Sequence, residues 1–249
     1  MFSLEGPARK PGQNRALAAF LSVIAGYVNA AGFILVGSFT SHVTGSAGRF
    51  ANNLVERDYF DAVSALLLVL AFFLGAFSAN VLLLTKLLSR RPLVYAGLLA
   101  LEASLLLAFI VIIDFKIAEN ASRSADAKAA ILCFCMGLQN SLVTVISEAR
   151  VRTTHLTGVV TDLGIEAARW LRYALGKLRA RADIEKPVAA TTQLLLTILF
   201  GFLFGAAGGA ELTRVYRANA MAAPAAAAFF AAAFAAWTGT RISRSTTKP

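Results

Sequence analysis

Both histidines of this chain lie in the same short motif, His-x-Thr-Gly, which occurs twice. The copies are Ser41-His42-Val43-Thr44-Gly45 and Thr154-His155-Leu156-Thr157-Gly158. A threonine hydroxyl can accept hydrogen bonds from the free amides of a helix start, so we expect Thr44 and Thr157 to be N-caps. Free amides at a helix start bind anions, and a glycine lets a ligand approach the backbone. Each motif therefore predicts an anion site in which the histidine donates to the anion or carries a proton. The alternative is a loop turn with a solvated histidine.

The motifs belong to a longer internal repeat. Gly26 and Asn29 precede the first motif, and Gly137 and Asn140 precede the second at an offset of 111 residues. Amides inside a membrane helix can bind substrate or hydrogen-bond a neighbouring helix, and both roles stay open for Asn29, Asn140 and the adjacent Gln139. One turn earlier, Gly26 and Gly137 would allow a close helix crossing.

The repeat extends through most of the chain. The motifs themselves are 113 residues apart, and the sequence FFLGA at 72–76 is echoed by FLFGA at 202–206. We therefore expect a single membrane domain, residues 1–249, with repeat one at 15–113 and repeat two at 127–238.

A carboxylate, Glu102, lies about ten residues into an apolar stretch. A charged side chain at the bilayer centre costs about 2.5–3.5 kcal/mol on insertion scales, so such residues usually face a cavity or a partner. We expect Glu102 to bind substrate or to couple transport to protons. A protonated glutamic acid with a purely structural hydrogen bond is the alternative.

The composition indicates that these residues belong to a membrane protein. Of 249 residues, 57% are hydrophobic and only 15% are charged, and the mean hydropathy is +0.66. A soluble domain of this composition would have no place for its excess apolar surface. A membrane helix needs about 20 mainly apolar residues. Six stretches qualify, over residues 17–37, 59–85, 92–113, 127–147, 187–210 and 218–237.

Details at the starts of these stretches refine the prediction. Pro92 and Pro187 open the third and fifth, which suits a first helical turn. The first stretch follows a basic segment like that of a signal peptide, but its apolar run continues to Val36, so we expect it to be retained.

The 24 Lys and Arg residues are unequally distributed among the loops. The N-terminus, the loop after the second stretch, the segment 148–186 and the C-terminal tail contain 17 of them, and the remaining loops contain 7. By the positive-inside rule, both termini are short cytoplasmic tails. This distribution accounts for the net charge of +10, so no nucleic-acid partner is expected.

Each repeat then consists of three membrane helices and a motif segment followed by a short amphipathic helix. Because three is odd, the second repeat is inverted relative to the first. The expected fold class is an all-α polytopic membrane protein with six transmembrane helices in two inverted repeats, an arrangement that recurs in secondary transporters. His42 is expected toward the outside and His155 toward the cytoplasm, so that no single site holds both.

The second amphipathic helix is expected over residues 158–181. Its apolar face lies opposite Arg169, Arg172 and Lys177. This pattern predicts a helix in the membrane interface, anchored by Trp170, with its charges near anionic lipid at the cytoplasmic face. A solvated helix is the alternative, and residues 46–57 are the expected counterpart in the first repeat.

These motifs resemble the YoaK-like family of bacterial inner-membrane proteins, which is classed as a domain of unknown function. The resemblance rests on GYVNA and GLQN, on SHVTG and THLTG, on the run VRTTHLTGVVTDLG and on a glutamate in the third span, and it extends over about residues 15–240. It implies six spans and a location in the bacterial inner membrane, and it implies no activity. Asn29 stands where the family commonly has an aspartate, so an ion-coupling role of that position would not extend to this chain.

Three classes of function follow. The first is a small secondary transporter or permease for a small anion, with proton coupling. In it, Asn29, Asn140 and Glu102 line the central site and the His-x-Thr-Gly segments act as gates. The second is a non-catalytic membrane scaffold or sensor whose contact surface is the basic amphipathic helix. The third is an intramembrane lipid enzyme with His42 and His155 as acid and base. No catalytic motif such as HExxH or GxSxG is present, so an enzyme is not expected.

Cys133 and Cys135 are expected to be packing residues. One residue separates them, so on a helix they point about 200° apart, which suits neither a metal pair nor a redox pair. No cofactor or metal site is expected. The sequence leaves the substrate and a homo-oligomeric state open.

Overall fold

The computed structural model describes residues 9–84, 91–115, 121–178 and 185–246, and within these ranges all regular structure is helical. Residue 85, the expected end of the second span, and residues 179–181 of the expected amphipathic helix lie outside the described residues. The elements in chain order are α1 (Pro11–Val36), α2 (Val43–Val55), α3 (Tyr59–Leu84), α4 (Arg91–Ile112), α5 (Ala121–Ser147), α6 (Leu156–Leu178), α7 (Ala189–Tyr216), the 3-10 helix η2 (Arg217–Met221) and α8 (Ala222–Thr246).

Five segments of the described chain are long and apolar enough to cross a membrane. Four are α1, α3, α4 and most of α5, and the fifth runs over residues 189–240, through α7, η2 and most of α8. The α3 helix leaves large apolar side chains such as Leu67, Phe73 and Phe77 exposed, as expected of a surface that faces lipid. The chain is therefore a helical membrane protein. Because the fifth segment includes both α7 and most of α8, length and hydropathy do not separate six spans.

Local sequence explains where α1 begins and ends. Pro11 occupies the first helical position, where its missing amide costs nothing, and the Lys10 N–H donates to Gln13 Oε1 at 3.0 Å. The helix stops at Gly37, which has φ +72° and donates its N–H to the Phe33 carbonyl at 2.9 Å. That left-handed conformation suits glycine and turns the chain back.

Of the two prolines expected in a first turn, one lies there. Pro92 is the second residue of α4. Pro187 instead precedes α7, because the extended Val188 is the N-cap and the helix begins at Ala189. The prediction for Pro187 is wrong by two residues.

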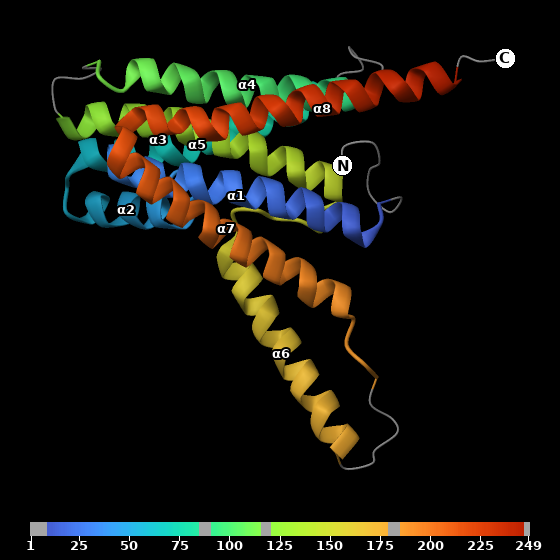
Figure 1. The fold of residues 1–249 in the computed structure, drawn as a ribbon. Coiled ribbons are helices and arrows are strands. Elements are labelled where there is room, and N and C mark those ends of the chain that lie inside the picture. The colour runs from blue at the N-terminus through green and yellow to red at the C-terminus, as the bar shows by residue number, and fades with distance from the viewer. Residues whose placement is uncertain (1–8, 85–90, 116–120, 179–184, 247–249) are drawn as a thin grey trace.

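Three pairs of helices pack along one another, α1 with α7, α3 with α5, and α4 with α8 (Figure 1). The short helix α2 lies beside the bundle and packs against α3. Helix α6 packs against α7, with a side-chain hydrogen bond as far along as Trp170, and its far end diverges from the bundle (Figure 1). Large side chains fill the space between the pairs, among them the fully buried Leu17, Tyr95, Phe109, Leu132 and Met136.

Glycines bring two of these pairs into backbone contact. A Cβ at Gly26 of α1 would overlap the carbonyl oxygen of Phe202 of α7. A Cβ at Gly137 of α5 would overlap the carbonyl oxygen of Phe72 of α3. In the repeat, Gly26 corresponds to Gly137 at an offset of 111, and Phe72 corresponds to Phe202 at an offset of 130. The two contacts are therefore equivalent.

The same crossings are tight from the opposite direction. A Cβ at Gly205 of α7 would overlap the Val23 carbonyl oxygen, and a Cβ at Gly75 of α3 would overlap that of Phe134. These four residues are also related by the two offsets. The first long helix of each half of the chain thus crosses the second long helix of the other half.

Candidate functional site

Both His-x-Thr-Gly segments line one cavity, with a volume of about 780 Å³. Helices α1, α3, α5 and α7 contribute further side chains to its wall. The lining residues are Asn29, Phe39, Ser41, His42, Val43, Thr44, Phe72, Asn140, Thr144, Arg152, Thr154, His155, Leu156, Thr157 and Phe202. We call this space the central cavity. Because both histidines line it, the expectation that no single site holds both is wrong.

The path of the chain explains this correction. After α5, the chain runs back along the bundle before α6 begins (Figure 1). The helices α2 and α6 therefore do not start at the ends of the preceding helices. The first residues of both, Val43 and Leu156, border the central cavity.

The two motifs have the same backbone geometry. The carbonyl of His42 accepts the Ser46 N–H and the carbonyl of His155 accepts the Val159 N–H, each at 3.1 Å. His42 is thus the N-cap of α2, without a side-chain cap, and the threonine lies in the first turn. The prediction that the motif threonines are N-caps is wrong, because each hydrogen-bond ladder begins two residues earlier.

The glycine of each motif makes room for its histidine. A Cβ at Gly45 would collide with the His42 ring, and a Cβ at Gly158 would lie 2.7 Å from His155 Nδ1. Each imidazole therefore folds over the first turn of its own helix, where only a glycine leaves space. This packing gives the His-to-Gly spacing a structural reason beyond the approach of a ligand.

Two asparagines fasten the motif segments to the bundle. Asn29 Oδ1 accepts hydrogen bonds from the Ser41 N–H at 3.1 Å and the Ser41 hydroxyl at 3.0 Å. Asn140 Oδ1 accepts a hydrogen bond from the Thr154 hydroxyl at 3.0 Å. Both asparagines also line the central cavity, so they hold the starts of α2 and α6 in place and present amides to the cavity.

The side chains of the central cavity favour negative charge. Arg152 is cationic, and no carboxylate occurs among the described residues that line the cavity. Sequence reasoning did not select Arg152, although it lies two residues before the second motif. Phe72 and Phe202 were also not selected as site residues, although they are the first residues of the similar FFLGA and FLFGA segments. The Phe39 ring packs edge-on to His42, with centroids 6.4 Å apart.

Four predicted site residues are absent from this lining: Gly45 and Gly158, which pack against the motif histidines, and Glu102 and Gln139. Glu102 is buried on α4, 1% exposed, and among the described residues its Oε1 has no hydrogen-bond partner. Gln139 is fully buried and donates from Nε2 to the Leu21 carbonyl at 3.3 Å. The structure therefore brings together the asparagines and both motifs, and places Glu102 and Gln139 elsewhere in the bundle. Cys133 and Cys135 are free thiols in the core.

The basic residues of α6 have different surroundings. Arg169 pairs with the buried Glu166 at 2.6 Å, whereas Arg172 and Lys177 are exposed. The Trp170 indole donates to Thr192 of α7 at 3.0 Å, so it fastens α6 to the bundle. In the part of the chain that the structure describes, no group of three or more His, Cys, Asp or Glu side chains is arranged to hold a metal ion.

Comparison with known proteins places the chain in one family. The family model described as a protein of unknown function, DUF1275, matches residues 17–234. No curated protein and no solved structure matches the chain.

Proposed function

We propose that this chain, which belongs to the DUF1275 family of unknown function, is a small secondary transporter that moves a small anion across the bacterial inner membrane. The observation that carries the proposal is the central cavity, which both motifs and the starts of α2 and α6 border. Its volume of about 780 Å³ lies within the usual range of small-molecule sites, roughly 300–1,000 Å³. We further propose that the YoaK-like proteins, which the motifs resemble, share this function.

The proposal includes six spans in two inverted repeats, formed by α1, α3, α4, α5, α7 and α8. The equivalent glycine crossings in the two halves support the repeat. The break at Arg217, with φ +51°, supports a turn between α7 and α8. In this arrangement α2 and α6 are half-helices that begin inside the membrane and run to opposite sides, as discontinuous helices do in transporters. Both termini then lie in the cytoplasm.

Electrostatics select the charge of the substrate. Each helix N-terminus is equivalent to about half a positive charge, and the start of each half-helix borders the cavity. Arg152 adds a full positive charge, and its planar guanidinium can bind a carboxylate or an oxyanion with two hydrogen bonds. The hydroxyls of Thr44 and Thr157 supply neutral donors. A small anion is therefore the substrate class that this cavity favours.

Proton coupling is a separate part of the proposal. Glu102 is buried and has an unpartnered oxygen among the described residues, but it does not line the central cavity. If it couples transport to protons, it does so through movement of α4 against its neighbours and not by contact with substrate.

Currents in proteoliposomes test the proposal. Purified protein on a solid-supported membrane is exposed to jumps of nitrate, phosphate, sulfate and acetate. We expect a transient current with at least one of these anions and a loss of at least tenfold in Arg152→Ala. The control Arg57→Ala removes an exposed arginine that does not line the cavity, and it should match the wild type. No current with any of the four anions, or an Arg152→Ala variant that matches the wild type, would contradict the proposal.

A membrane scaffold or sensor is the second candidate. The divergence of α6 from the bundle favours it, because that helix exposes Leu171, Leu175 and the cations Arg172 and Lys177 (Figure 1). These side chains suit an anionic lipid surface. For a scaffold, replacing Arg172 and Lys177 by glutamine changes function and replacing Arg152 does not.

A further inference from the structure

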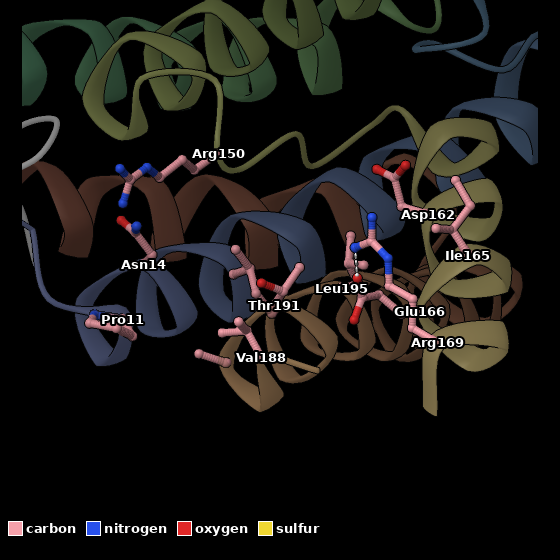
Figure 2. Close-up of a pocket in the computed structure, with 12 residues that line it drawn as sticks. Pro11, Asn14, Arg150, Asp162, Ile165, Glu166, Arg169, Val188, Thr191 and Leu195 are labelled. Atoms are coloured by element: carbon pink, nitrogen blue, oxygen red, sulfur yellow. Dashed lines mark hydrogen bonds and ion pairs between the residues drawn. The ribbon is translucent and has the colours of Figure 1, made fainter. Parts of the chain in front are cut away.

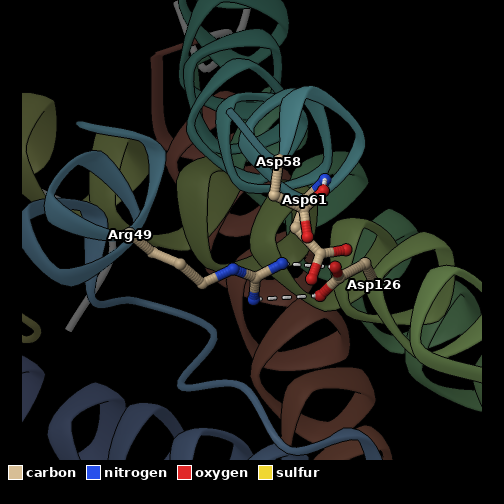
Figure 3. A network of polar contacts seen from close by, with 4 residues as sticks. All are labelled: Arg49, Asp58, Asp61 and Asp126. Carbon is tan, nitrogen blue, oxygen red and sulfur yellow. Dashed lines mark hydrogen bonds and ion pairs between the residues drawn. The ribbon is translucent and has the colours of Figure 1, made fainter. Parts of the chain in front are cut away.

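An ion pair fastens α2 to the bundle. Arg49 of α2 makes two contacts with Asp126 of α5: Nη1 donates to Oδ1 at 3.2 Å, and Nη2 contacts Oδ2 (Figure 3). The Asp126 side chain is only 8% exposed. Asp58 and Asp61, at the start of α3, lie beside the pair (Figure 3). Such a two-point contact between arginine and carboxylate is directional and among the stronger polar interactions.

The repeat relates this pair to a second pair with exchanged charges. At the motif offset of 113, Arg49 corresponds to Asp162 of α6. At the offset of 111, Asp126 corresponds to Arg15 of α1. The cation thus lies on the half-helix in the first pair and on the long helix in the second pair. Either half-helix can form an attractive pair with the bundle.

The second pair is not formed. Asp162 lines a cleft of about 630 Å³ between α1, α6 and α7, together with Asn14, the neighbour of Arg15 (Figure 2). Arg15 and Asp162 both lie in the described part of the chain and make no ion pair there. Arg15 instead donates to Gln193 of α7 at 2.5 Å.

The internal repeat relates the cleft to the region around the Arg49–Asp126 ion pair. At the offset of 130, Asp58 and Asp61 correspond to Val188 and Thr191, and both of these line the cleft (Figure 2). The region around Arg49–Asp126 is therefore closed, because α2 packs on the bundle there. The equivalent region at Asp162 is open, because α6 diverges from the bundle.

We infer that Arg49–Asp126 and Arg15–Asp162 are the two gates of the transporter, and that this structure has the first closed and the second open. The inference rests on the proposed transport function and its inverted repeat. With both termini in the cytoplasm, the open cleft faces the cytoplasm. Movement of α6 toward α1 joins Asp162 to Arg15 and closes that side, and separation of Arg49 from Asp126 frees α2 and opens the other side.

Accessibility of a cavity cysteine tests the first gate without a known substrate. Thr44→Cys is placed in a background that carries Cys133→Ala and Cys135→Ala, and is labelled with an impermeant maleimide in right-side-out and inside-out vesicles. We expect labelling mainly in inside-out vesicles. Arg49→Ala should raise labelling in right-side-out vesicles at least threefold, and the control Arg57→Ala should not. The exchange Arg49→Asp with Asp126→Arg should restore the low value.

Cross-linking tests the second gate. In the same background, Arg15→Cys with Asp162→Cys should be joined by a short bis-maleimide, and the yield should rise when Arg49→Ala is added. The matched control is Arg15→Cys with Gly164→Cys. It places the second thiol about 200° around α6 from Asp162 and should not be cross-linked.

The outcomes separate the two proposals. If Thr44→Cys is labelled from the cytoplasmic side and Arg49→Ala does not raise its labelling in right-side-out vesicles, the gates are overturned and the transporter proposal stays. The absence of the Arg15–Asp162 cross-link in both backgrounds has the same consequence. A Thr44→Cys thiol that reacts from neither side in any variant overturns both.

Discussion

Replacing Gly26 by alanine is expected to destabilise the protein at the crossing of α1 and α7. The new Cβ would overlap the Phe202 carbonyl, a backbone atom that cannot yield without a shift of α7. Overpacking costs about 1–3 kcal/mol, and a backbone neighbour belongs in the upper part of that range. Alanine recovers up to about 1 kcal/mol through its higher helix propensity. The expected net loss is about 1–2 kcal/mol.

Thermal unfolding in detergent, followed by tryptophan fluorescence, measures this loss. At about 2–4 °C per kcal/mol for a chain of this size, Tm should fall by about 2–8 °C. Gly137→Ala should give a similar fall, because it makes the equivalent contact with Phe72. The matched control is Gly208→Ala on α7, where a Cβ would meet nothing within 4 Å, so Tm should stay the same or rise.

Two results would refute this reasoning at different points. If Gly26→Ala is as stable as Gly208→Ala, α1 and α7 do not cross at backbone contact. If Gly26→Ala is destabilised and Gly137→Ala is not, the two crossings are not equivalent, and the inverted repeat loses its main support.

Three further predictions concern the site and the topology. Asn29→Ala should lower Tm, because the Ser41 N–H and hydroxyl lose their acceptor at a cost of about 1–3 kcal/mol. Asn29→Asp keeps an acceptor and should leave Tm unchanged. Equal Tm values for the two variants would exclude the anchoring role. In intact cells that lack Cys133 and Cys135, an impermeant thiol reagent should label Ala47→Cys and not Val160→Cys; equal labelling would contradict the inverted topology. Glu102→Gln should keep normal abundance but abolish the dependence of anion currents on an imposed proton gradient; unchanged dependence would remove Glu102 from coupling.

The membrane helices could be located from the sequence because an apolar run of sufficient length is stable in few structures other than a membrane-spanning helix. Their ends were less predictable. α5 begins at Ala121 and not at residue 127, and α7 continues to Tyr216 and not to residue 210. In both cases polar residues with adequate helix propensity extend the helix beyond its apolar part, where hydropathy gives no signal.

The site was predictable in its parts and not in its assembly. The repeated motif identified the starts of two helices, and an offset of 111 identified the asparagines that anchor them. The meeting of both motifs at one cavity depends on the path of residues 37–42 and 148–155, which no local pattern specifies. Arg152 lies in a basic loop, where the positive-inside rule already accounts for a cation.

Glu102 shows a further limit of sequence reasoning. Its depth in the membrane follows from its position along an apolar run. Its direction around the helix axis does not, because α4 is apolar on nearly every side. A helix without a polar face gives no periodic signal that distinguishes a cavity from a neighbouring helix. The structure places this carboxylate in the bundle core, apart from the central cavity.

Packing explains why α2 and α6 would be the moving elements of the proposed transporter. α1 crosses α7, and α5 crosses α3, at backbone contacts that join the two repeats. Because close-packed contacts transmit strain, the repeats cannot rock as rigid bodies without breaking both crossings. The half-helices have no such constraint: α2 has no fully buried residue, and α6 packs against α7 alone among the described elements. A change of access therefore depends on α2 and α6, and the exchanged ion pairs lie where these helices meet the bundle.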